Sequence, residues 1–226
     1  MVAGRLSEVR ERIAAAATRA GRAPEDVKLV AVSKTAGPGA LRAAYDAGQR
    51  DFGENRASRL VEMAGLLPGD VRWHFLGRLQ GNKVGRVRPV IHLLHSLDRA
   101  ELAGYWMKGP GFPPPVLIQV NVAAEAAKGG VPPGEAESLV EAAAGLGLEV
   151  RGLMTIPPLP GGPEDSRPHF RELAALGARL ARRWPGLIEL SMGMTEDFEV
   201  AVEEGATLLR VGRAIFGPFP ESGRRE

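Results

Sequence analysis

The sequence predicts a single (β/α)8 barrel, an α/β fold of the TIM-barrel type, with an extra helix at its N-terminus. Three observations support this fold class: short apolar runs alternate with helical stretches, eight such runs fit into the 226 residues, and no linker or low-complexity block separates them. Strict alternation implies parallel strands joined by right-handed crossovers. Eight units of this size close most economically into one barrel over residues 1–226, which leaves no length for a second domain.

The hydrophobic pattern defines each element in chain order. Apolar residues at three- and four-residue spacing predict the first helix over roughly 4–20. The strand candidates are the short apolar runs 27–33, 51–53, 72–76, 90–95, 116–122, 149–154, 187–191 and 207–211. Helical stretches are expected at 39–48, 57–67, 98–107, 135–146, 167–184 and 196–204, with a further short one before residue 90. A doubly wound open sheet is the alternative, but its glycine-rich phosphate turn after the first strand is missing.

Composition excludes several classes of protein. A content of 44% hydrophobic and 25% charged residues excludes disorder, and no apolar run approaches the roughly 20 residues of a membrane span. Without cysteine or metal-ligand spacing, disulfides and metal sites are not expected. The first residues lack an apolar signal core, so we expect a cytoplasmic protein. The net charge of +2, with no basic stripe, argues against nucleic-acid binding. Abundant Arg, Glu and Pro indicate a thermophile source.

Candidate chemistry lies where the strands end, because active sites of such barrels form on the loops that follow the strands. All three asparagines of the chain, Asn55, Asn82 and Asn121, fall on this face. Lys34 ends an almost wholly apolar strand, so we expect its amine to project into the barrel mouth. A desolvated amine there is nucleophilic, as Schiff-base chemistry requires. A lysine that snorkels to the rim is an equally good interpretation of Lys34 alone.

The segments after the last two expected strands predict a phosphate site. They read Ser191-Met-Gly-Met-Thr195 and Arg210-Val-Gly-Arg-Ala-Ile-Phe-Gly217. Barrel loops after strands seven and eight often bind phosphate through backbone N–H groups and hydroxyls. Two glycine-containing turns with helix caps are the competing interpretation. His74 and His95 are weaker evidence, since a satisfied interior histidine is the simpler interpretation of each.

Several segments together carry a resemblance to a known family. They are Leu29-Val-Ala-Val-Ser-Lys-Thr35, Gly48-Gln-Arg-Asp-Phe-Gly-Glu-Asn55, Trp73-His-Phe-Leu-Gly77 and the two segments above, in order between residues 29 and 217. In these the chain closely resembles the pyridoxal phosphate homeostasis proteins. The resemblance implies a fold type III barrel, similar to the N-terminal domain of alanine racemase, that binds pyridoxal 5′-phosphate (PLP). The cofactor-binding residues that it implies are Lys34, Asn55, His74, Met154, Ser191, Gly193, Met194, Thr195, Arg210, Gly212 and Arg213.

The same resemblance implies a role for each of these residues. Lys34 would attach the cofactor as a Schiff base, and Arg210 would lie against the pyridine nitrogen. Asn55, His74 and Met154 would line the ring pocket, while Ser191, Gly193, Met194, Thr195, Gly212 and Arg213 would hold the phosphate. The family commonly has threonine where Arg213 stands, so one hydroxyl donor is lost, although a guanidinium can pair with phosphate.

The expected function is non-enzymatic carriage or buffering of PLP, in vitamin B6 and amino-acid homeostasis. A cationic arginine beside the ring nitrogen disfavours protonation of that nitrogen and weakens the ring as an electron sink. Both tyrosines, Tyr45 and Tyr105, fall on expected helices, so no tyrosine base of the racemase kind is evident. PLP-dependent apoenzymes are the candidate recipients, and a monomer is expected because a large partner domain is absent. The alternatives are a PLP-dependent amino-acid racemase and an aldolase that uses Lys34 on a sugar phosphate.

Overall fold

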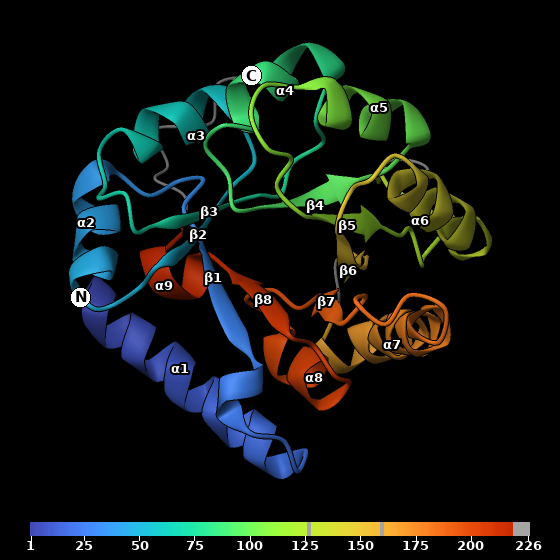
Figure 1. Cartoon of the computed structure of the whole chain (residues 1–226). Coiled ribbons are helices and arrows are strands. Elements are labelled where there is room, and N and C mark those ends of the chain that lie inside the picture. Colours follow the sequence, from blue (N-terminus) through green and yellow to red (C-terminus); the bar gives the residue numbers. More distant parts are fainter. Residues whose placement is uncertain (126–127, 159–160, 219–226) are drawn as a thin grey trace.

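A closed barrel of eight parallel strands forms the centre of the protein (Figure 1). The computed structural model describes residues 1–125, 128–158 and 161–218. The strands are β1 (Lys28–Val32), β2 (Asp51–Glu54), β3 (Arg72–Phe75), β4 (Leu93–Leu97), β5 (Val116–Gln119), β6 (Val150–Met154), β7 (Glu189–Ser191) and β8 (Leu208–Val211). Each strand pairs with the next in sequence, and β8 closes the ring on β1 in the register Lys28↔Leu208 to Ala31↔Val211. The predicted fold class is confirmed.

Helices surround the strands, and each crossover returns the chain to the same end of the barrel (Figure 1). The α-helices are α1 (Val2–Arg19), α2 (Pro38–Asp46), α3 (Ala57–Ala64), α4 (Val84–Val87), α5 (Ala100–Lys108), α6 (Ala136–Gly145), α7 (Arg167–Ala181), α8 (Phe198–Glu203) and α9 (Arg213–Phe216). Four 3-10 turns complete them: η1 (Pro24–Asp26), η2 (Gly81–Lys83), η3 (Pro133–Glu135) and η4 (Pro163–Ser166). Within the described residues, no helix combines the length and apolarity that crossing a membrane requires.

The extra N-terminal helix packs on the outside of the barrel. Leu6, Val9 and Ile13 of α1 are buried, as their helical spacing predicts. This apolar face contacts α2, α8 and α9, so the first helix covers elements from both ends of the chain (Figure 1). The helix thereby supports α9, which directly follows the last strand.

Several elements begin or end up to three residues from their expected bounds, and two differences have a plain local cause. The fourth strand begins at Leu93, three residues later than expected, because the Val90 N–H donates to the Val87 carbonyl and still belongs to the preceding turn. The helix α9, over Arg213–Phe216, was not among the expected helices. It is a single turn, too short to show a hydrophobic period in the sequence.

Candidate functional site

A pocket of about 310 Å³ opens where β1, β2, β7 and β8 end. We call it the Lys34 pocket. Its lining is Val32, Lys34, Asn55, Leu76, Ile156, Met194, Thr195, Glu196, Asp197, Arg210, Gly212 and Arg213. Seven of the eleven expected site residues are in this set: Lys34, Asn55, Met194, Thr195, Arg210, Gly212 and Arg213. Segments that are far apart in the sequence therefore meet at one end of the barrel, as expected for loops after parallel strands.

His74 and Met154 lie below this pocket. Side chains two residues apart on a strand face the same side, so each inward-facing position has a neighbour one layer deeper. Leu76 and Ile156 line the pocket, whereas His74 and Met154, two residues earlier, are buried in the barrel interior. We expected these two residues to line the pocket, and the structure places them one layer of side chains deeper.

Arg59 holds the loop that carries Lys34 through hydrogen bonds to its backbone. This guanidinium donates to the carbonyl oxygens of Ser33, at 3.1 Å, and of Ala36, which bracket Lys34. It also donates to Glu54 at 3.1 Å, and the Ser33 hydroxyl donates to the same Glu54 oxygen at 2.6 Å. Lys34 itself is exposed, so the desolvation that we expected at this amine is not what the structure shows.

Glu54 is a buried carboxyl that the sequence did not single out. It is fully buried, and one of its oxygens has no hydrogen-bond partner among the described residues. Burial raises the pKa of this carboxyl, although the hydrogen bonds from Ser33 and Arg59 oppose the change. Glu54 ends β2 and Arg59 lies in α3, so only the fold brings them next to the Lys34 loop.

The loop after β7 is held in one conformation by Gly193 and Asp197. Gly193 has a φ of +90°, and a Cβ placed there would lie 2.5 Å from the Cβ of Ala201, so the position requires glycine. The Met194 N–H donates to one carboxylate oxygen of Asp197 at 2.7 Å, and the Ser166 hydroxyl donates to the other at 2.7 Å. Both oxygens of Asp197 are thus engaged in fixing the loop that presents Thr195.

The last segment of the pocket begins α9. Gly212 occupies the position before the first helical residue, and the first amide groups of a helix have no partner within it. The Arg213 guanidinium forms an ion pair with Glu196 at 3.0 Å, with both side chains largely exposed. The charge at the position where the family commonly has threonine is therefore already paired at the pocket edge.

Arg210 projects from β8 into the base of the pocket and is almost fully buried. It donates to the Ser191 hydroxyl oxygen at 2.6 Å and to the Thr155 carbonyl at 2.7 Å. Burial lowers the pKa of Arg210 to about 10, with the charge of Asp197 opposing the change. The guanidinium is consequently still charged at neutral pH, and no carboxylate of the described residues contacts it.

A chain of buried hydrogen bonds leads from Arg210 through the barrel interior to the opposite end. His95 Nδ1 lies 2.8 Å from the Ser191 hydroxyl oxygen, and its Nε2 lies 2.8 Å from Nδ1 of His74. His74 Nε2 then lies 3.1 Å from Asp51, at the first residue of β2. We call this chain the interior relay. It places Ser191 in the interior, outside the pocket lining.

The groups of the interior relay differ in what they can donate. Burial lowers the pKa of His95 well below its usual range, so this ring is neutral. Asp51 is ionised and accepts from His74. A neutral His95 carries one ring hydrogen, so it donates to one of its two partners, His74 and Ser191, and accepts from the other. The Ser191 hydroxyl, which we expected on a phosphate, is thus engaged inside the barrel by Arg210 and His95.

At its far end the interior relay reaches a second cavity, of about 320 Å³. Asp51, Arg72, His74 and His92 are among its lining residues. Burial opposes ionisation of Asp51, but hydrogen bonds from Arg72 and His74 hold its pKa well below the usual range. Arg72 binds both carboxylate oxygens of Asp51. No cluster of metal-ligating side chains is found in the described part of the chain.

Comparison with known proteins gives a consistent set of relatives. The chain is 46% identical over 219 residues to the pyridoxal phosphate homeostasis protein of Aquifex aeolicus, covering 94% of this chain and 96% of that protein. It is 40% identical over 228 residues to the protein of the same name from Escherichia coli K12, covering 96% of each. No protein-family model matches the chain.

Solved structures show the same fold. The chain matches PipY of Synechococcus elongatus, solved with PLP bound, with a TM-score of 0.80 and 33% identity, over 96% of this chain and all of that one. The lysine/ornithine decarboxylase of Vibrio vulnificus, complexed with cadaverine, matches with a TM-score of 0.70 and 15% identity, over 91% of this chain and 62% of that one. The second likeness shows a shared barrel only.

Proposed function

Because this chain belongs to the family of pyridoxal phosphate homeostasis proteins, we propose that it binds PLP in the Lys34 pocket and acts as a carrier or buffer of the cofactor. The observation that carries the proposal is that one pocket gathers an amine, a buried guanidinium and a hydroxyl-bearing glycine loop. When bound, PLP supplies an aldehyde that condenses with primary amines.

The residues present fit this group. Lys34 provides the amine for covalent attachment, while Thr195 and the first amides of α9 suit an anionic phosphate. Arg210 would lie against the pyridine nitrogen of the cofactor, and Asn55 would line the wall beside the ring. Ser191 and His74 hold Arg210 in place through the interior relay and make no contact of their own with the pocket.

The acid–base groups around the pocket favour carriage over turnover. Glu196 is paired with Arg213, and both oxygens of Asp197 are hydrogen-bonded. The Tyr45 hydroxyl donates to Asp70, and neither tyrosine lines the pocket. Lys34 is thus the one pocket residue, among those described, that suits proton transfer at a bound amino acid. A racemase-like enzyme is the alternative, since Lys34 could transfer a proton on one face of a bound amino acid.

The attachment is tested by absorbance spectra of wild type and Lys34→Ala after incubation with PLP and removal of the excess. We expect an imine band in wild type and its loss in Lys34→Ala, with Lys108→Ala, an exposed lysine at the end of α5, keeping the band. An identical band in wild type and Lys34→Ala would show that another amine is used.

Exchange of the α-hydrogen of L-alanine in D2O separates the two candidate functions. A carrier leaves this hydrogen in place at stoichiometric enzyme concentration, whereas a racemase exchanges it with turnover. We also infer a monomeric, cytoplasmic protein that supplies PLP to apoenzymes. Light scattering tests the monomer, and reactivation of an apoenzyme by the loaded protein tests the delivery.

A further inference from the structure

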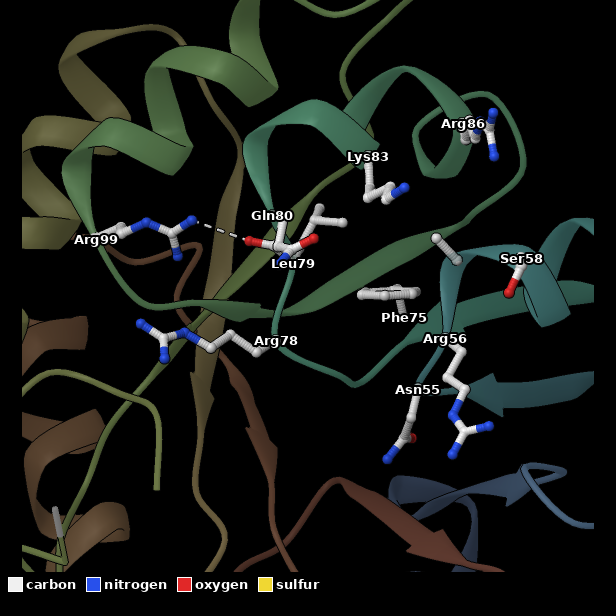
Figure 2. A pocket seen from close by; sticks show the side chains of 11 residues that line it. Asn55, Arg56, Ser58, Phe75, Arg78, Leu79, Gln80, Lys83, Arg86 and Arg99 are labelled. Atoms are coloured by element: carbon white, nitrogen blue, oxygen red, sulfur yellow. Dashed lines mark hydrogen bonds between the residues drawn. The ribbon is translucent and has the colours of Figure 1, made fainter. Parts of the chain in front are cut away.

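Another cavity, of about 530 Å³, is lined by several basic side chains (Figure 2). It shares Asn55 with the Lys34 pocket. We call it the rim pocket. Its lining is Asn55, Arg56, Ala57, Ser58, Phe75, Arg78, Leu79, Gln80, Lys83, Arg86 and Arg99. Five of the chain's 29 basic residues are in this set, and none of the acidic residues that the structure describes is. The other 24 basic residues are outnumbered by the 27 acidic ones, so the positive charge of the protein is concentrated here.

These charges are poorly compensated by the protein itself. Asp98 forms ion pairs with both Arg99 and Arg78, the latter at 3.5 Å, and Arg99 has a further, longer contact with the exposed Glu101 at 4.0 Å. Arg56, Lys83 and Arg86 have no ion pair with any carboxylate of residues 1–125, 128–158 and 161–218. Like charges gathered in one cavity repel each other unless an anion joins them.

The start of α3 adds to the positive potential. The helix begins at Ala57 with Arg56 as its N-cap residue, no side chain caps it, and its first turn has no acidic residue. Its first amide groups lack partners within the helix, and the helix dipole places partial positive charge at this end. Arginine is the opposite of what a helix start favours, which is a small polar or acidic residue. Such a conflict between local preference and structure is typical of a binding site.

The shape of the cavity favours a small molecule over a protein surface. Phe75 and Leu79, each 1% exposed, form an apolar floor, and Figure 2 shows Phe75 between Lys83 and Arg56. The volume lies within the roughly 300–1,000 Å³ of small-molecule sites. Arg99 is fixed by its bond to the Leu79 carbonyl at 3.0 Å, the dashed line in Figure 2. The walls are therefore partly preorganised.

We propose that the rim pocket binds a phosphorylated organic molecule with at least two negative charges. Arg56, Lys83 and Arg86 would hold the anionic groups at the start of α3, and the apolar floor would contact the organic part. Asn55 lines both cavities, so this ligand would lie next to the Lys34 pocket. The proposal depends on the charges and shape of the rim pocket and not on the proposed function.

The test uses inorganic pyrophosphate as the probe and isothermal titration calorimetry as the measurement. We expect saturable binding to wild type that the double substitution Lys83→Gln and Arg86→Gln weakens by about tenfold or more. The matched control, Lys108→Gln with Arg182→Gln, removes the same charge from exposed positions elsewhere and should bind like wild type. Circular dichroism checks that all variants are folded.

A further variant separates the rim pocket from the neighbouring one. Thr195→Val alters the Lys34 pocket alone and should leave pyrophosphate binding unchanged. The proposal is overturned by the absence of saturable binding up to about 10 mM, by equal affinity of the double variant and wild type, or by equal loss in the matched control. Loss of binding in Thr195→Val would place the anion in the Lys34 pocket and also overturn it. None of these outcomes depends on an imine at Lys34.

Discussion

Arg210 carries a charge in the barrel interior, where an isolated ion is costly unless it is compensated. Its direct partners, the Ser191 hydroxyl and the Thr155 carbonyl, are neutral. The interior relay connects this cation to the carboxylate of Asp51 through two histidine rings. Hydrogen bonds in a chain polarise one another in a low-dielectric interior, so a distant anion contributes to the stability of the cation.

Asp51 is the residue through which this arrangement should respond to acid. Its pKa in the folded state lies below the unfolded value, so it contributes stability above the unfolded pKa of roughly 3.9 and loses that contribution as the pH falls. We expect Asp51→Asn to lower the free energy of unfolding by about 1–3 kcal/mol at pH 7. The loss should begin to shrink towards pH 3, because the Asp51 carboxyl of the unfolded wild-type chain then binds a proton while the folded one stays ionised.

Urea unfolding between pH 3 and pH 7 measures this effect. Asp46→Asn is the control, because its ion pair with Arg42 is exposed on both sides and should contribute about 0.5 kcal/mol or less. A loss in Asp51→Asn that is constant across this pH range would contradict an ionised, stabilising Asp51.

At the scale of elements, the turn between β7 and α8 positions the side of the Lys34 pocket that we propose for the phosphate. Gly193 adopts a left-handed conformation and packs against Ala201 of α8. We expect Gly193→Ala to destabilise the protein by about 2–4 kcal/mol, since backbone strain and a steric clash add. Gly186→Ala, in open space with an ordinary backbone conformation, should change the stability by less than about 1 kcal/mol.

Thermal unfolding of the two glycine variants provides the comparison. The proposed binding of PLP should be affected as well, because a shifted turn moves Thr195 away from α9. Similar melting temperatures for Gly193→Ala and Gly186→Ala would show that the turn relaxes without cost, and that glycine is not required there.

The same elements show what the sequence could predict. Lys34, Thr195 and Gly212 directly follow strands, so locating the strands was enough to place them at one end of the barrel. Depth within a strand is harder to predict, because residues two apart face the same side and differ only by one layer. His74 and Met154 were therefore expected at the level that Leu76 and Ile156 occupy.

The interior relay was beyond sequence reasoning for a related reason. His95 and Ser191 are 96 residues apart, and they meet only because the barrel closes with a particular register. Neither the spacing nor the composition of the chain marks them as partners. Arg56, Lys83 and Arg86, which no described carboxylate pairs with, come from the segments after β2 and β3, so their grouping also appears only in the folded chain.

At the scale of the whole molecule, ion pairs tie the two ends of the chain together around the barrel. Arg12 and Arg19 of α1 bind Glu199 and Glu203 of α8, at 3.0 Å each. Arg167, at the start of α7, also binds Glu203, at 2.8 Å. One acidic helix, α8, is thus held between the first helix and the seventh, and it directly follows the loop that carries Thr195.

Arg167 is the centre of this network and the residue on which to test it. It binds Glu164, Glu203 and Glu204 at 2.6–2.8 Å and is only a quarter exposed, so solvent screens it less than a surface pair. Its hydrogen bonds lower the pKa of Glu203 and contribute, after the bond from Arg171, to lowering that of Glu204. Both carboxylates thus stabilise the fold above their unfolded pKa, and this contribution is lost as the pH falls.

We therefore expect Arg167→Gln to lower the free energy of unfolding by about 1–2 kcal/mol at neutral pH and low salt. Part of this loss should disappear in about 1 M NaCl, where the Debye length falls to about 3 Å. Arg183→Gln is the matched control, because its ion pairs with Glu137 and Glu141 are largely exposed and should contribute about 0–1 kcal/mol. Urea unfolding at two salt concentrations measures both variants. Equal losses would mean that burial does not strengthen this network.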